Sequence, residues 1–249
     1  MKTINSTSNS VVKEVKKLQQ KKYRQETGLF VVENFKIISD AFNSGYIPVK
    51  IFVTSDFIKK NPEIDSIIGK VGEGYEIDDK VNKSISNLDS PAGILAVYSQ
   101  IPEKFDSAVN SLYLNAISDP GNLGTLLRSA VAFDFHNVIL DSGCVDLYNP
   151  KVIHAAKDAV FKLNFSFSKQ LSDLKDDYVI VSTPVHDGGR FVAATKPVCL
   201  VLGSESHGVD SELELLADQK VTIKTSGQIE SLNVAMAGAI IMEKIFNFK

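Results

Sequence analysis

From residue 111 onward, short uninterrupted apolar runs alternate with segments of helical spacing. The runs lack the alternation of polar and apolar residues that a strand with one solvent-exposed face shows, so they are typical of strands buried on both faces. Such strands occur in parallel sheets that carry helices on both sides. We therefore predict an α/β domain. Its predicted strands are 112–117, 137–140, 178–182, 198–202 and 221–223, and its predicted helices are about 122–133, 150–156, 210–217 and 232–246.

Residues 1–98 predict a smaller α/β unit ahead of this sheet. Its expected elements are a helix from Asn9 or Ser10 to about Arg24, strands at 29–33, 49–54 and 93–98, and a helix over 35–43 that ends at Gly45. Residues 99–107 contain Pro102 and no core-forming pattern, which favours a linker. We expect three parts: a small domain at 1–98, a linker at 99–107 and the sheet domain at 108–249.

Composition excludes several classes of protein. The 249 residues are 44% hydrophobic and 23% charged, which is typical of a globular chain. The two cysteines, Cys144 and Cys199, form no CxxC pair and lie near no histidine at zinc-ligand spacing, so we expect neither a disulfide framework nor a metal site. The start of the chain lacks the apolar core of a signal peptide, and the run 234–242 is too short to span a bilayer, so we expect a cytoplasmic protein that contacts no membrane.

Charge points to one candidate surface for nucleic acid. The net charge of −3 argues against nonspecific coating of nucleic acid. Residues 13–24 nevertheless carry a local charge of +5, because six basic residues face only Glu14. The six are Lys13, Lys16, Lys17, Lys21, Lys22 and Arg24. This cluster could bind phosphates, or it could be the solvated face of a helix whose apolar stripe contains Val12 and Val15.

Three unusual turns fall at the predicted carboxyl edge of the sheet, where open α/β sheets bind ligands. The first, at 119–124, reads DPGNLG and leads into a helix. Its Pro and Gly make a tight turn that leaves Asn122 and the first helix amides pointing above the strand. Arg128 follows six residues after Asn122. The alternative is an ordinary connection with a surface arginine.

The second turn, at 201–208, reads VLGSESHG and follows the most hydrophobic strand. It places Glu205 on a loop where packing seldom requires a carboxylate, and Gly203 would let a ligand approach the backbone. We interpret His207 as an exposed turn residue rather than a metal ligand, because no third ligand lies at suitable spacing.

The third turn, at 223–233, leads into a helix rich in Ala and Gly. Ser231 and Asn233 are natural helix-start residues, so capping alone could explain them. The small residues of the helix fit either close packing within the chain or a dimer interface. The chain contains no GxxxxGK[ST], GxGxxG, GxSxG or HExxH motif, which removes support for ordinary NTPase, dehydrogenase, hydrolase and metalloprotease functions.

Together the three turns resemble a known family. DPGNLGTLLRSAVAFDF is similar to motif 1 of the SpoU, or TrmH-type, RNA ribose 2'-O-methyltransferases of the SPOUT superfamily. LVLGSESHG is similar to motif 2 and IKTSGQIESLNVAMA to motif 3, in the same order and spacing. The segments INSTSNSVVKEVKKL, GLFVVEN and SPAGILAVY resemble more weakly the L30e-like RNA-binding domain that often accompanies this family.

The resemblance implies a SPOUT domain with a carboxyl-terminal trefoil knot, S-adenosylmethionine as the cofactor, a homodimer, and RNA as the partner, with ribosomal RNA preferred to tRNA. The cofactor contacts that it implies are Thr183, Leu202, Gly203, Ile223, Leu232 and Asn233. The catalytic residues that it implies are Arg128, Asn122, Glu205, Ser231 and Asn233. The basic cluster at 13–24 would contact RNA.

The sequence also departs from the family pattern. Asp158, Ser204 and Asn34 stand where Gly, Asn and Gly are frequent in the family. Because none of them is a predicted catalytic residue, these departures bear on substrate geometry more than on the reaction. Two other functions stay open at this point: a catalytically silent RNA-binding dimer of the same fold, and a small-molecule enzyme of Rossmann type, which would need a phosphate-binding glycine loop that the sequence lacks.

Overall fold

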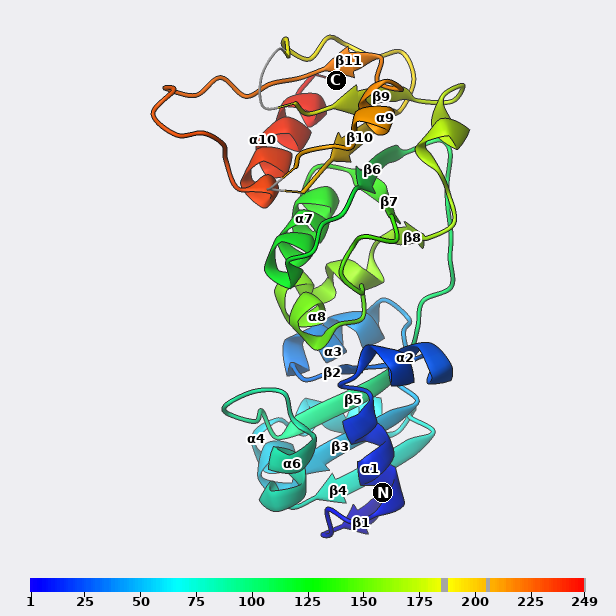
Figure 1. Cartoon of the computed structure of the whole chain (residues 1–249). Coiled ribbons are helices and arrows are strands. Elements are labelled where there is room, and N and C mark those ends of the chain that lie inside the picture. The colour runs from blue at the N-terminus through cyan, green and yellow to red at the C-terminus, as the bar shows by residue number, and fades with distance from the viewer. Residues whose placement is uncertain (185–187, 205–206, 249) are drawn as a thin grey trace. The chain divides into compact units, whose positions relative to one another are not determined.

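A computed structural model describes residues 1–184, 188–204 and 207–248 of the chain (Figure 1). The contacts divide the chain into two compact units. The first unit contains Met1–Ile101 and Asp146–Phe161, and the second contains Pro102–Val145 and Lys162–Lys249. None of the helices in the described ranges is long and apolar enough to span a membrane.

The first unit is built on a five-stranded mixed sheet. The strand order is β1 (Lys2–Ile4), β4 (Glu73–Ile77), β3 (Lys50–Thr54), β5 (Ile94–Ser99) and β2 (Leu29–Val32). Strands β1, β4 and β3 are parallel, whereas β5 runs antiparallel to both β3 and β2. The sequence analysis missed β1, which is very short, and β4, in which Gly74 interrupts the apolar residues.

The first unit contains more helices than the two that the sequence predicts within residues 1–98, at 10–24 and 35–43. Its helices are α1 (Ser10–Lys17), α2 (Lys21–Thr27), α3 (Phe35–Asn43), α4 (Ser55–Lys60), α5 (Asp65–Ile68), α6 (Asp79–Ile85) and α8 (Pro150–Ala156), with 3-10 turns at Pro62–Ile64 and Lys157–Phe161. The single helix predicted over 10–24 is wrong, because Gln20 adopts an extended conformation between α1 and α2. At this break, Nη1 of Arg24 donates to the carbonyls of Leu18 and Gln19 at 2.8 and 2.9 Å.

The second unit contains a six-stranded sheet in which every strand pair among the described residues is parallel. The strand order is β11 (Gln219–Lys220), β9 (Val179–Ser182), β10 (Val198–Leu202), β6 (Asn110–Leu114), β7 (Phe135–Leu140) and β8 (Asn164–Ser166). The predicted parallel, fully buried sheet is confirmed, since all five residues of β10 are buried. The strand predicted at 221–223 is wrong: β11 lies just before it, and Val221 makes only an isolated bridge to Gly189.

Within its described residues, the second unit contains three helices and a 3-10 turn at Leu171–Leu174. They are α7 (Pro120–Ala132), α9 (Ser211–Glu214) and α10 (Val234–Phe246). Helix α10 packs closely on α7 and β10 at Gly238, where a Cβ atom would lie 2.6 Å from Leu126 and 2.7 Å from Leu202. Gly238 therefore serves close packing within the chain, which is one of the two predicted explanations for the small residues of this helix.

Residues 146–161 pack in the first unit, although the sequence analysis placed them in the sheet domain that starts at 108. Asp146 accepts hydrogen bonds from Nε and Nη2 of Arg24, and Nε lies 2.8 Å from the carboxylate. The ring of Tyr148 lies 4.7 Å from that of Phe30 on β2, and the ring of Phe161 lies 6.1 Å from the same Phe30 ring. An ion pair with a buried arginine and an aromatic cluster thus hold this segment, and sequence order does not reveal them.

Candidate functional site

The second unit contains a cavity of about 520 Å³ where β9 and β10 end. Thr183 and Pro184 follow β9, Leu202 ends β10, and Gly203 and Ser204 follow β10. The segment 221–234 forms a further wall, and Ala237 and Ile241 of α10 complete it. The cavity therefore lies at the carboxyl edge of parallel strands, where this type of sheet binds ligands.

Gly203 lets the turn after β10 fold back on itself. A Cβ atom at Gly203 would lie 1.9 Å from the carbonyl oxygen of Gly208, so no other residue fits without moving the backbone. The N–H of Gly208 donates to the carbonyl of Ser204 at 2.9 Å, and Gly208 has a φ of 71° that favours glycine. The space at Gly203 that the sequence assigned to a ligand is occupied by the backbone of Gly208. His207 is exposed, as predicted.

Two threonines connect the walls of the cavity. Oγ1 of Thr183 donates to the carbonyl of Val201 at 3.1 Å. Oγ1 of Thr222 donates to the carbonyl of Pro184 at 3.0 Å, which joins the segment after β9 to the segment after β11. These hydrogen bonds fix the backbone of two walls, and a cavity walled by fixed backbone can hold a ligand in one orientation.

The starts of α7 and α10 meet beside this cavity. Oδ1 of Asn233 caps α10 by accepting from the N–H groups of Ala235 and Met236 at 3.0 and 3.3 Å. Its Nδ2 donates to Oδ1 of Asn122 at 2.9 Å. The structure thus brings together two predicted catalytic residues that are far apart in the sequence. Asn233 combines the capping role with this second contact.

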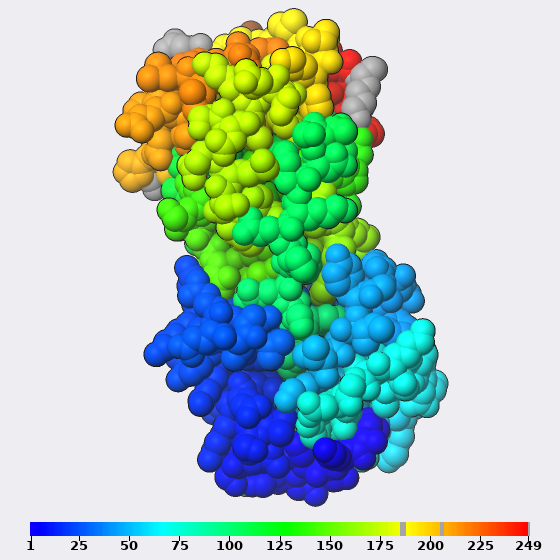
Figure 2. Space-filling view, turned by 90° about the vertical axis from the view of Figure 1, so that its right-hand side faces the viewer, coloured from blue at the N-terminus to red at the C-terminus, as the bar shows by residue number. Residues whose placement is uncertain are grey.

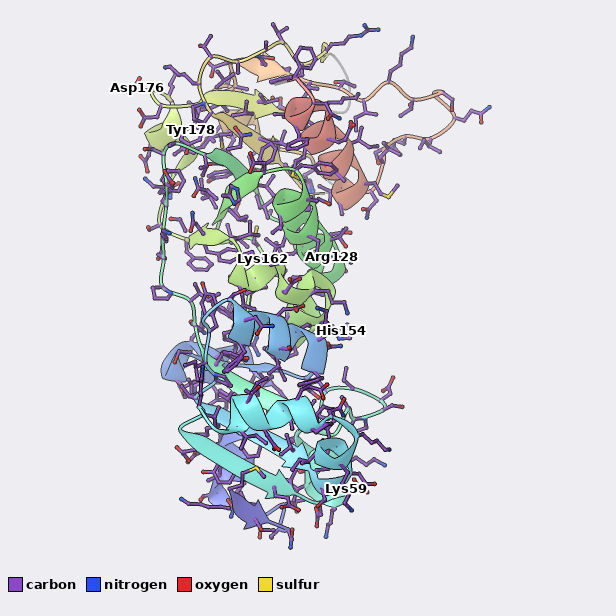
Figure 3. All side chains as sticks on the ribbon, turned by 180° about the vertical axis from the view of Figure 1, so that it is seen from behind. Lys59, Arg128, His154, Lys162, Asp176 and Tyr178 are labelled. Carbon is purple, nitrogen blue, oxygen red and sulfur yellow. The ribbon has the colours of Figure 1, made fainter. Side chains whose placement is uncertain are left out.

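Arg128 lies on the exposed surface of α7 and does not line the cavity (Figure 3). It follows Asn122 by six residues, which places it about 9 Å further along the helix axis and rotated by about 240°. Asn122 contacts Asn233 beside the cavity, so Arg128 presents a different face of α7. Arg128 can therefore act on a bound molecule only if the face of α7 that carries Arg128 contacts that molecule.

The other predicted site residues divide into three groups. Thr183, Leu202, Gly203, Ile223, Ser231 and Leu232 all line the cavity. Asn233 lies just beside it, and Glu205 falls outside the described residues. The sequence analysis missed the contribution of α10, although Val234, Ala237 and Ile241 recur at helical spacing and line one wall.

A polar cluster below the turn after β10 was also missed. Asn115 is only 3% exposed, and its Nδ2 donates to Asp141 at 2.7 Å and to Asp210 at 2.9 Å. Its Oδ1 accepts from the N–H of Asp210 at 2.9 Å. One amide therefore ties the end of β6 to the segments that follow β7 and the 203–208 turn. The only signal in the sequence is a polar residue directly after an apolar strand.

The basic cluster at 13–24 divides in the structure. Its five lysines are exposed on α1 and α2. The N-terminal part of the chain that contains these helices is blue in Figure 2. Arg24 is 2% exposed, and its guanidinium is engaged by Asp146 and by two backbone carbonyls. The prediction that Arg24 contacts RNA is therefore wrong for this structure, because the side chain is buried in an ion pair. The five lysines are exposed, as contact with RNA would require.

Neither cysteine is suited to act as a nucleophile. Burial raises the pKa of the Cys144 thiol to about 12, and it also raises the pKa of Cys199, which is fully buried. Only the thiolate is an effective nucleophile. Both side chains therefore stay protonated near neutral pH and serve packing.

Comparison with known proteins matches both parts of the chain. Residues 110–243 match the SpoU rRNA Methylase family, and residues 9–96 match the MRM3-like substrate binding domain. The chain is 31% identical over 248 residues to the 23S rRNA (guanosine(2553)-2'-O)-methyltransferase RlmP of Bacillus subtilis, which covers 97% of this chain and 98% of that protein.

Solved structures share the architecture. A crystal structure of an RNA 2'-O ribose methyltransferase superposes with a TM-score of 0.80 at 28% identity, over 98% of each chain. The AdoMet-bound rRNA methyltransferase from Sinorhizobium meliloti superposes with a TM-score of 0.88 over 99% of this chain and 97% of that chain. At 24% identity, this second likeness concerns the fold alone.

Proposed function

The chain belongs to the SpoU rRNA Methylase family, and from that premise we infer that it is an S-adenosylmethionine-dependent methyltransferase acting on a ribose 2'-hydroxyl of ribosomal RNA. The observation that carries this function is the cavity at the ends of β9 and β10, because all three turns with family motifs converge on it or beside it. The similarity to RlmP favours ribosomal RNA over tRNA as the substrate, and the cytoplasm is the proposed place of action.

The cavity fits S-adenosylmethionine in size and in the chemistry of its walls. Its volume of about 520 Å³ lies within the range of about 300–1,000 Å³ for small-ligand pockets. Leu202, Ile223 and Ile241 offer apolar surface for an adenine ring, while Thr183 and Ser231 add hydroxyl groups. When bound, the cofactor supplies a methyl group on a sulfonium. We propose Thr183, Leu202, Gly203, Ile223 and Leu232 as its contacts, with Asn233 next to them.

The amide pair formed by Asn122 and Asn233 would position the ribose. Their hydrogen bond holds the first turns of α7 and α10 in one arrangement beside the cavity. Ser231 lines the cavity two residues before Asn233. Glu205, from motif 2, is proposed to complete this polar set. Holding the hydroxyl in line with the methyl group lowers the entropic part of the barrier.

Arg128 is proposed to bind the adjacent RNA phosphate and to stabilise the alkoxide charge that develops on the reacting oxygen. A guanidinium is never deprotonated near neutral pH, so it does not act as a general base. Its planar fork can hold phosphate and ribose oxygens together. Another oxygen accepts the proton.

Because Arg128 does not line the cavity of its own chain, we propose a homodimer in which α7 of one protomer faces the cavity of its partner. Exposed apolar side chains at the end of α10 support this proposal, since Phe246 is 39% exposed and Phe248 is 56% exposed. The family resemblance also predicts dimer formation through α7 and α10. The trefoil knot that the resemblance implies is proposed as part of the same fold.

Isothermal titration calorimetry with S-adenosylmethionine and no RNA tests the proposed function. We expect saturable binding, and we expect Leu232→Trp to weaken it by tenfold or more because the indole fills the cavity. Leu215→Trp is the matched control, since Leu215 is 84% exposed in the same unit and does not line the cavity. An unmutated, folded protein that gives no heat at millimolar cofactor would support the alternative of a catalytically silent RNA-binding dimer.

A further inference from the structure

The first unit holds a second cavity, of about 370 Å³, that the methyl-transfer chemistry does not use. Its walls come from the end of β2, the start of α3, the segment after α6 and the start of α8. All lining residues belong to the first unit, including those of the 146–161 segment. The volume lies near the lower end of the range for small-ligand pockets, so the cavity suits a ligand of about one nucleotide.

The floor of this cavity is apolar. Val31, Ile37 and Ile153 line it and are only 2–3% exposed in the folded chain. Pro150 and Leu88 add further apolar surface. A flat aromatic ring can bury its face against such a floor, whereas a phosphate or a sugar alone would leave it without a matching surface.

Two asparagines on the walls present oriented hydrogen-bond donors. Oδ1 of Asn34 caps α3 by accepting from the N–H of Ile37 at 3.2 Å. Oδ1 of Asn149 caps α8 by accepting from the N–H of Lys151 at 3.0 Å. Each cap fixes the amide plane. Among the residues that the structure describes, the Nδ2 group of neither asparagine has a hydrogen-bond partner.

Acceptors stand on the same walls. Nε2 of Gln19 donates to the carbonyl of Ile85 at 3.4 Å, which leaves its Oε1 as an acceptor. Glu33 accepts from the backbone N–H and Nδ2 of Asn87, at 2.8 and 2.9 Å, and from Ser86. These bonds hold the segment after α6 in place as a wall. The lining thus combines amide donors and acceptors above an apolar floor, which is the pattern that reads the edge of a nucleobase.

Positive charge lies at the rim. Lys151 and His154 both line the cavity, and both are exposed on α8. Figure 3 labels His154. An ammonium group beside a base-sized cavity can bind the phosphate of the same nucleotide. His154 adds a ring that can stack on a base or donate to a phosphate oxygen.

We propose that this cavity binds one unstacked nucleotide of the RNA substrate, with the base on the Val31–Ile37–Ile153 floor, its edge on Asn34 and Asn149, and its phosphate on Lys151 and His154. The inference rests on the proposed function, since it takes RNA as the substrate. It assigns base recognition to the first unit and separates it from the role proposed for the lysines of α1 and α2, which is contact with phosphates.

Substitution of asparagine by aspartate tests the base contact without removing a cap. In Asn34→Asp and Asn149→Asp, Oδ1 still caps the helix, because aspartate is as good a cap as asparagine. The Nδ2 donor is replaced by a charged acceptor. Asn43→Asp is the matched control, since Asn43 is exposed at the opposite end of α3 and carries the same change of charge.

Fluorescence anisotropy with labelled oligo(A), oligo(C) and oligo(U) of eight nucleotides provides the measurement. We expect the unmutated protein to prefer one of these homopolymers by about tenfold, as one good base contact is worth about 1–3 kcal/mol. Each aspartate variant should lose that preference, and Asn43→Asp should keep it. Lys151→Ala should weaken the binding of all three RNAs by a similar factor. Lys59→Ala, on α4, should leave their binding unchanged (Figure 3).

Photocrosslinking with an oligonucleotide that contains 4-thiouridine locates the contact independently. We expect crosslinks in peptides that contain residues 31–37 or 149–154. Crosslinks confined to the peptides of α1 and α2 would overturn the inference, as would equal affinity for the three homopolymers. Competition by free AMP at micromolar concentration would also overturn it, because the cavity would then serve a mononucleotide.

The outcome is separable from that of the proposed function. All variants should bind S-adenosylmethionine as the unmutated protein does, because the cofactor cavity lies in the other unit. If the nucleotide cavity is wrongly assigned, cofactor binding and lysine-dependent RNA binding persist. If the proposed function is wrong, the unmutated protein fails to bind the cofactor whatever the homopolymers show.

Discussion

The two units each contain a cavity, but they build it in different ways. In the second unit, the walls are loops that follow neighbouring parallel strands, and close backbone approaches such as that of Gly203 to Gly208 shape them. In the first unit, the walls are side chains from segments as distant as Gln19, Asn87 and His154. The cavity of the second unit therefore depends on backbone and glycine, and the cavity of the first unit depends on amide side chains.

This difference explains why one cavity could be located from sequence and the other could not. Parallel strands end at a common edge, so motifs that follow predicted strands must converge there. No comparable rule connects residues 146–161 to the sheet of the first unit. That connection depends on the ion pair between Arg24 and Asp146 and on the contact between Phe30 and Tyr148.

The largest expected effect tests whether the Arg24–Asp146 pair holds together the walls of the cavity in the first unit. Arg24→Met removes a guanidinium that is 2% exposed and leaves the Asp146 carboxylate without its partner. Breaking a buried pair in this way costs about 3–5 kcal/mol, which urea unfolding measures. Cofactor affinity in the second unit should not change.

Lys22→Met is the control, because Lys22 is exposed and only 3.8 Å from Glu26 in a surface pair. Its loss should cost about 0.5 kcal/mol or less. An equally small loss for Arg24→Met would show that residues 146–161 are held by other contacts. A matching loss of cofactor affinity would show that the two cavities are not independent.

The next largest effect concerns catalysis in the second unit. Arg128→Ala should lower turnover by at least about a hundredfold, or roughly 3 kcal/mol, because a phosphate and the developing alkoxide lose their cation. Arg128→Lys should recover little activity, since it lacks the planar fork. Transfer of labelled methyl groups to ribosomal RNA measures both, and calorimetry should show unchanged cofactor affinity.

Mixed dimers sharpen this test. Arg128→Ala and Leu232→Trp protomers should together show activity that neither shows alone, if Arg128 serves the cavity of its partner. Arg190→Ala, at another exposed arginine of the same unit, is the control and should keep near-normal turnover. Full activity of Arg128→Ala would remove this residue from the mechanism, and a monomer in light scattering would remove the dimer.

The smallest expected effect concerns the exposed lysines of the first unit. Reversing Lys13 and Lys16 to glutamate should weaken RNA binding by about tenfold and lower the slope of log affinity against log salt by about two, because two phosphate contacts are lost. The control reverses Lys59 and Lys60, which are exposed on α4. An unchanged salt slope would make the α1 lysines a solvated surface, which is the alternative that the sequence left open.

The sequence by itself determined the elements whose signal is local. Helices 35–43 and 150–156 and strand 198–202 agree with the structure, because apolar spacing and capping residues define them within a few residues. It also predicted that motifs 2 and 3 would meet, and Gly203, Ile223 and Leu232 line one cavity. Buried parallel strands leave a continuous apolar signal, and their carboxyl ends must share an edge.

Only the tertiary structure decided how polar groups distant in the sequence are paired. Arg24 has the same sequence signal as its neighbouring lysines, yet it is buried against Asp146, whereas the lysines face solvent. Asn115, which is also buried, likewise finds its partners in remote segments. A buried charge or amide must be satisfied by whichever group the folded chain brings within hydrogen-bonding distance, and local periodicity carries no information about that group.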